Sequence, residues 1–364
     1  MRILAAALVI ATVALGAPAG AADNAEPQAG SVLKATLESY IRPSYAALGE
    51  RASQLRAATG KLCETASGHD LQDARQAFGG LVDAWSRIEW LRTGPVMADN
   101  RLERILFYPD RKSTGLKQVQ RAIASGDETA ADFDALAGAS VAMQGLGAIE
   151  YLLFGSGNEA LLGEPQSHRC RYALAVAANL QAIAGEIARA WSEGSPLSEA
   201  FLEPAGDNPL FRDGREALNL VLATMIHGLE AIRDIRIGAF LKEDGRDRPL
   251  VAVYRRSGLT LRSVTADLEG LLALFDDSDL QHALPADGAG LADQVRFEFA
   301  QSIRTAKSLD ESAGGDIETL LADKTRRQKL AYLQLSIRYV IERLNDEIAP
   351  AAGLSAGFSF GDGD

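Results

Sequence analysis

Histidine and cysteine are scarce in this sequence. The 364 residues include 4 histidines and 2 cysteines, and no two histidines stand three or four positions apart. A catalytic zinc usually has three protein ligands, mostly histidine together with a carboxylate, and the sequence has no H-E-x-x-H motif. The spacing of its residues therefore indicates no zinc site. A glycine-rich phosphate loop following a strand is also absent.

Basic residues are fewer than acidic residues in this sequence. Lys and Arg number 37 against 49 Asp and Glu, which gives a net charge of −12. This balance argues against binding to nucleic acid or to anionic lipid surfaces. It is compatible with cationic ligands, including metal ions.

Aromatic residues make up only 6% of the chain, and runs of β-branched residues are few. Alanine and leucine are abundant, and both favour helix. The sequence therefore predicts an all-α protein.

The length of the chain is typical of two domains. The clearest linker is the stretch 194–214, which is rich in proline, glycine, aspartate and asparagine.

The first 22 residues have the organisation of a secretory signal peptide. Arg2 provides the charged start, Ile3–Leu15 is apolar, and Ala19–Ala21 forms a small-residue cleavage site. The apolar segment is too short to span a bilayer, and no cysteine follows it for lipid attachment. We expect export to a bacterial periplasm, with no transmembrane segment in the mature chain.

Export bears on the two cysteines. Cys63 and Cys170 form an even pair in an oxidising compartment. They are either joined by a disulfide, which would tie the first expected helix to the fourth, or remain as two buried thiols.

The stretch Ala135–Phe154 contains a single charged residue, Glu150. Read as one helix, it places Glu150 on an apolar face with Met143 and Leu146. A carboxylate there is costly unless it is paired, protonated or bound to a ligand. Glycines such as Gly145 and Gly147 are usually kept where another backbone or a ligand comes close.

Three interpretations of Glu150 remain open. It could form a buried ion pair with Arg92, Arg101 or Arg104. The rings of Trp85 and Tyr151 would then close the site. It could line a ligand pocket between two bundles. It could also bind a metal ion, and joined by Glu89 it would form a hard oxygen site suited to Ca²⁺, Mn²⁺ or iron.

Gly145-Leu-Gly-Ala-Ile-Glu150, continued by Tyr-Leu-Leu-Phe-Gly155, resembles the G-x-H-x-x-E signature of the imelysin family, also called the M75 peptidase family. Gly147 stands at the position of the signature histidine. Three further segments, 84–95, 101–110 and 255–258, resemble parts of the same family. The resemblance covers most of the mature chain.

This resemblance implies an all-α, imelysin-like fold of two packed four-helix-bundle-like halves. A short internal similarity between Gly145–Glu150 and Gly228–Arg233 favours the same arrangement. We therefore expect a signal peptide at 1–22, an N-terminal helical bundle at 23–200, a C-terminal helical bundle at 210–350 and a flexible tail at 351–364.

Imelysin-like proteins are linked to iron uptake and to the cell envelope. The resemblance thus implies a periplasmic binding or accessory protein that takes iron or another divalent metal, or a small molecule that carries one. An M75-type metallopeptidase is the alternative, and glycine at the histidine position counts against it. A third possibility is a protein-interaction module with a partner in the cell envelope.

Overall fold

The computed structural model describes residues 25–285 and 288–355. The expected signal peptide and most of the expected tail lie outside these ranges. Within them the chain forms helices and turns and no strand, so the predicted all-α fold is confirmed. No helix in the described part is both long enough and apolar enough to cross a membrane.

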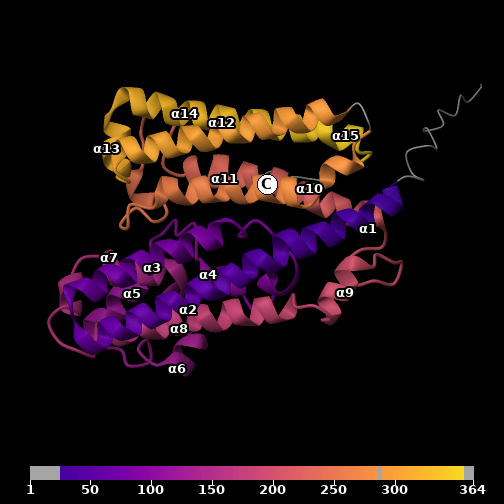
Figure 1. The fold of residues 1–364 in the computed structure, drawn as a ribbon. Coiled ribbons are helices and arrows are strands. Elements are labelled where there is room, and N and C mark those ends of the chain that lie inside the picture. The colour runs from indigo at the N-terminus through magenta and orange to yellow at the C-terminus, as the bar shows by residue number, and fades with distance from the viewer. Residues whose placement is uncertain (1–24, 286–287, 356–364) are drawn as a thin grey trace, which may run out of the picture.

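Four helices of the first half pack in a ring (Figure 1). Helix α2 packs on α3 and on α8, and α7 completes the ring between α3 and α8. Their bounds are Arg42–Thr65 for α2, Gly68–Ser86 for α3, Gly145–Phe154 for α7 and His168–Ala190 for α8. Three short helices fill the connection from α3 to α7: α4 (Arg101–Ile105), α5 (Thr114–Ser125) and α6 (Phe133–Ala137).

Four helices of the second half form a similar ring. Helix α11 packs on α10 and α12, and α14 packs on α12 and α10. Their bounds are Gly214–Ala231 for α10, Thr260–Asp277 for α11, Ala289–Ala313 for α12 and Lys324–Arg343 for α14. Two shorter helices are α13 (Ile317–Ala322) and α15 (Ala349–Ala351). The two rings meet where α3 packs against α11.

The leading helix α1 (Ala25–Ala35) connects the halves. A π-helical segment, Thr36–Ile41, joins it to α2 without a break, so the helix is continuous through Pro43, which lies in the first turn of α2. Figure 1 shows α1 leaving the first bundle towards α10. The helix α1 packs on α10 and also contacts α9 (Pro196–Leu202). The expected domain boundaries stay a prediction, but α1 is continuous with α2 of the first ring and packs on α10 of the second.

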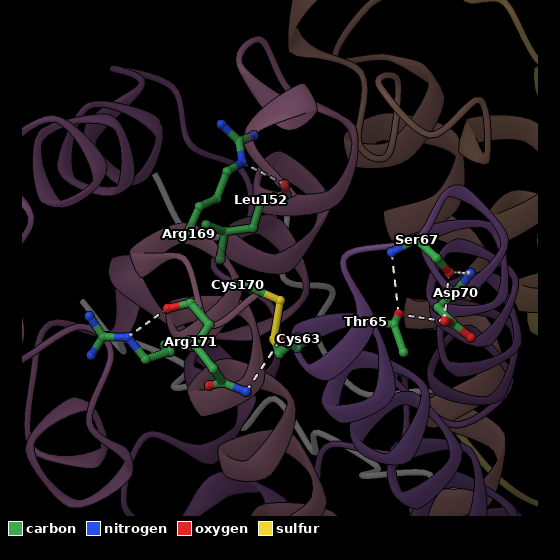
Figure 2. Close-up of a disulfide and its surroundings, with 9 residues drawn as sticks. Cys63, Thr65, Ser67, Asp70, Leu152, Arg169, Cys170 and Arg171 are labelled. Atoms are coloured by element: carbon green, nitrogen blue, oxygen red, sulfur yellow. Dashed lines mark hydrogen bonds between the residues drawn. A yellow bond between two sulfur atoms is a disulfide. The ribbon is translucent and has the colours of Figure 1, made fainter. Parts of the chain in front are cut away.

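A disulfide joins α2 to α8 inside the first bundle (Figure 2). Cys63 and Cys170 are bonded, with their Cα atoms 5.4 Å apart. Next to it, the buried Arg169 donates to the carbonyl oxygens of Leu152 at 2.8 Å and Tyr151 at 2.7 Å. A cation at these carbonyls satisfies the last turn of α7 and fixes the direction of that helix.

Two predicted helices are wrong in extent. The stretch Ala135–Phe154 is α6, a 3₁₀ turn (Val141–Met143) and α7, because Gly145 has φ +81°, outside the helical range. Met143 therefore precedes the helix that carries Glu150. Apolar spacing also predicts a helix over about 70–92, with Trp85, Glu89 and Arg92 stacked on it. The helix α3 ends at Ser86, so these three residues do not share one helical face.

Candidate functional site

Glu150 lies on the inner side of α7 and is 4% exposed. Its Oε1 atom accepts hydrogen bonds from the backbone N–H groups of Arg256 at 2.9 Å and Ser257 at 3.0 Å, and from the Ser257 hydroxyl at 3.0 Å. Arg256 and Ser257 belong to the loop that leads into α11. The carboxylate therefore fastens α7 of the first bundle to the second bundle.

The surroundings of Glu150 are partly cationic. The Arg256 guanidinium lies 3.8 Å from Oε2 and 5.3 Å from the centre of the Tyr151 ring. Burial raises the pKa of Glu150 above its usual value, although the hydrogen bonds from Ser257 and the charge of Arg256 oppose that effect. Glu150 is thus held mainly as a hydrogen-bond acceptor for the loop.

A crevice of about 130 Å³ opens beside Glu150, and we call it the Glu150 crevice. Its walls come from α7, from the segment after α4 and from the loop before α11; they include Gly147, Glu150, Tyr151, Tyr108, Val253 and Arg256. Gly147 is exposed, and a Cβ atom there would meet nothing within 4 Å. The structure therefore leaves open space at Gly147.

The three arginines proposed as partners of Glu150 have other contacts. Arg104 donates to Gln144 at 3.2 Å and to Asn179 at 2.9 Å. Arg101 pairs with Asp99 and Glu186, each at 3.0 Å. These partners were not foreseen, and the prediction that Arg101 or Arg104 meets Glu150 is wrong, because the loop before α11 fills that position.

Arg92 does not line the Glu150 crevice; its guanidinium lies 5.3 Å from the centre of the Trp90 ring, and both residues line a different cavity. Trp85 is buried among the helices of the first bundle, next to Leu146, and does not line the crevice. Gly145 also lies outside the crevice walls and packs against the backbone that ends α4, with the Arg104 and Ile105 carbonyls 2.5 Å from an added Cβ. Of the predicted set, Gly147, Glu150 and Tyr151 come together at one site.

Glu89 belongs to a second buried polar group, between the bundles, which sequence reasoning missed. Its carboxylate accepts from Arg236 Nη2 at 2.5 Å, and Asp267 Oδ1 accepts from Trp90 Nε1 at 3.1 Å. The Arg236 guanidinium also lies over the rings of Tyr108 and Trp90, at 4.9 and 5.5 Å. We call Glu89, Trp90, Arg236 and Asp267 the interbundle cluster.

Asp267 is fully buried. Burial, and to a smaller extent the charge of Glu89, raises the pKa of Asp267 well above its usual value. Its Oδ2 accepts no hydrogen bond from the described residues, while Glu89 lies within hydrogen-bonding reach of the side chain. The protonated form of the Asp267 carboxyl is therefore favoured. The sequence did contain a signal, because Arg236 and Asp267 each interrupt an apolar helical face.

The residues around Glu150 do not offer a metal ion the ligands that it requires. Oε1 already accepts three hydrogen bonds, and the nearest charged group is a guanidinium. In the described ranges one group has three residues placed to hold an ion: His69, Asp70 and Asp73. There Asp70 is engaged by Lys61 at 3.0 Å and by the Thr65 and Ser67 hydroxyls (Figure 2).

Comparison with known proteins connects this architecture to a family. The family model for imelysin (Peptidase M75) matches residues 41–344. No curated protein matches the chain in sequence.

Two solved structures share the fold. An imelysin-like protein from Psychrobacter arcticum 273-4 aligns with a TM-score of 0.73 and 19% identity over 91% of this chain and 98% of its own. A protein from Parabacteroides distasonis ATCC 8503 described as an iron-regulated protein A precursor aligns with a TM-score of 0.66 and 15% identity, over 88% and 94% of the two chains. The match to the family model over most of the chain shows that this protein belongs to the imelysin family.

Proposed function

We propose that this protein is an exported binding protein of the cell envelope that takes part in iron or metal uptake and has no peptidase activity. Its ligand occupies the Glu150 crevice. The observation that supports this proposal best is the environment of Glu150. One carboxylate oxygen of Glu150 accepts hydrogen bonds from the loop before α11, while the neighbouring space at Gly147 is open.

This use of Glu150 does not suit hydrolysis. A general base needs a lone pair directed at the attacking water, and a catalytic metal needs several protein ligands. Oε1 is occupied by two backbone N–H groups and a hydroxyl, and burial favours the protonated carboxyl. The residues of the crevice serve better to bind than to activate water.

The crevice favours a metal-bearing small molecule over a bare ion. Arg256 places a cation in the wall with 22% of its side chain exposed, and Tyr151 contributes an aromatic ring. A cation repels a bare metal ion but attracts an anionic complex that carries one. One relative in fold is described as iron-regulated, which agrees with an iron-bearing ligand.

Export rests on the sequence of residues 1–22, and the disulfide agrees with it. Disulfides persist in oxidising compartments such as the periplasm and are rare in the cytosol. The bond between Cys63 and Cys170 therefore supports a periplasmic location.

Closing the crevice tests the proposal. Gly147→Leu adds a side chain into open space, and Gly49→Leu makes the same change on α2, where a Cβ also meets nothing within 4 Å. In titration calorimetry with ferric citrate, we expect binding by the wild type and by Gly49→Leu, and binding weakened about tenfold or more by Gly147→Leu.

Two results would contradict the proposal. Equal binding by all three proteins would place the ligand elsewhere. Chelator-sensitive cleavage of a protein substrate, absent in Glu150→Ala, would favour the metallopeptidase instead.

A further inference from the structure

A second depression adjoins the Glu150 crevice and differs from it in charge. It has a volume of about 430 Å³ and lies between the loop that follows Tyr108 and the chain that leaves the π-helical segment Ile232–Ile237. Its walls include three cations, Arg111, Lys242 and Arg248. We call this space the basic depression.

The cations of the basic depression are available to a ligand. Arg111 and Arg248 are exposed, and neither forms an ion pair with a carboxylate in the described part of the chain. Lys242 Nζ donates to the carbonyl oxygen of Gly238 at 2.6 Å, which leaves its other N–H groups able to donate.

The two acids in the same walls are already engaged. Asp110 accepts from the backbone N–H groups of Thr114 at 2.6 Å and Gly115 at 3.0 Å, so its charge serves the start of α5. Asp234 forms an ion pair with Arg233 at 2.6 Å. The basic depression therefore keeps a positive excess on a chain whose net charge is −12.

We propose that the basic depression binds a small organic or inorganic polyanion through Arg111, Lys242 and Arg248. The site goes beyond the proposed function, because it uses none of the contacts of Glu150. Three separate cations around one space match a ligand with two or more carboxylates or phosphates, since Arg forks pair with both groups and Lys adds a point charge. The volume falls in the range of small-molecule sites.

Charge-removing variants test this site. The triple variant Arg111→Gln/Lys242→Gln/Arg248→Gln removes the cations. The matched control, Arg121→Gln/Arg215→Gln/Lys324→Gln, removes three exposed cations that lie outside the depression. The probes are iron-free citrate, pyrophosphate and the monoanion acetate, measured by titration calorimetry at low and at high salt.

We expect the wild type and the control variant to bind citrate or pyrophosphate more tightly than acetate, and to lose affinity as salt rises. The depression variant should bind the polyanion about tenfold or more weakly, because it lacks the charge-assisted hydrogen bonds of all three cations. The tighter of the two polyanions identifies carboxylate or phosphate as the recognised group.

Three outcomes would overturn the site. The wild type could bind neither polyanion, or the control variant could lose as much affinity as the depression variant, which would show a diffuse charge effect. The third is loss of citrate binding in Gly147→Leu, which would move the anion into the Glu150 crevice. Failure of the ferric citrate test alone leaves these results unaffected, so the two proposals fail separately.

Discussion

Arg236 and Glu89 form a buried ion pair across the junction of the two bundles. Nη2 of Arg236 lies 2.5 Å from the Glu89 carboxylate, and the two residues are 3% and 5% exposed. Glu89 follows α3 and Arg236 follows α10, so the pair joins chain segments from the two rings. The Nε and Nη1 groups of Arg236 find no hydrogen-bond acceptor in the described residues and face aromatic rings.

The first prediction concerns this pair. Arg236→Met should lower the free energy of unfolding by about 3–5 kcal/mol, because it leaves a buried carboxylate without its partner. The control is Arg262→Met, which breaks a more exposed interbundle pair with Asp83 and should cost roughly 0–1 kcal/mol. Urea denaturation measures both. Equal losses of unfolding free energy in the two variants would show that the buried pair contributes no more to stability than the exposed pair.

The second prediction concerns Asp267 and pH. Its pKa is raised in the folded protein, so the folded state holds the proton more tightly than the unfolded state. Stability from this group is complete below the unfolded pKa and is lost as pH rises through the folded pKa. Asp267→Asn keeps the oxygen that accepts from Trp90 and adds an N–H for Glu89, so its stability should fall less between pH 5 and pH 8. Urea denaturation across this pH range measures the free energy of unfolding of both proteins. The same pH dependence in the wild type and in Asp267→Asn would refute the prediction.

The third prediction separates the shape of Glu150 from its charge. Glu150→Gln keeps an oxygen that can accept from the Arg256 and Ser257 N–H groups, and we expect a small change in stability. Glu150→Ala leaves both partly buried N–H groups without an acceptor, at about 1–3 kcal/mol each. Thermal denaturation at constant pH checks the order. A Gln variant as unstable as the Ala variant would show that the negative charge itself is required.

The fourth prediction uses two glycines of α7. Gly145→Ala should be strongly destabilising, because Gly145 has φ +81° and an added Cβ would lie 2.5 Å from the carbonyl oxygens of Arg104 and Ile105. Gly147→Ala should raise stability by about 0.5–1 kcal/mol, since alanine favours helix and the space is open. Chemical denaturation of both variants provides the test, and a neutral Gly145→Ala would contradict the close packing.

The fifth prediction concerns the disulfide. The bond between Cys63 and Cys170 spans 107 positions in sequence, and a loop of that size contributes about 4–5 kcal/mol by restricting the unfolded chain. The double variant Cys63→Ala/Cys170→Ala should lose about this amount. Reductant should destabilise the wild type and leave the variant unchanged, and a similar effect on both would point to a different cause.

Much of the fold followed from local pattern. The abundance of alanine and leucine and the scarcity of β-branched runs were enough to predict an all-α chain. The apolar neighbours of Glu150 indicated its burial. Two cysteines in a chain predicted to be exported left a disulfide as one of two open alternatives. These features depend on residues close together in sequence, or on composition.

The partners of the polar groups were decided by tertiary structure alone. Glu150 meets Arg256 and Ser257, more than 100 positions away, rather than the nearer arginines that charge alone suggested. Arg236 meets Glu89 across a similar separation. The sequence indicates that a buried charge needs a partner but does not identify that partner. The packing of the two bundles determines the partner, because only the assembled interface brings the two groups within hydrogen-bonding distance.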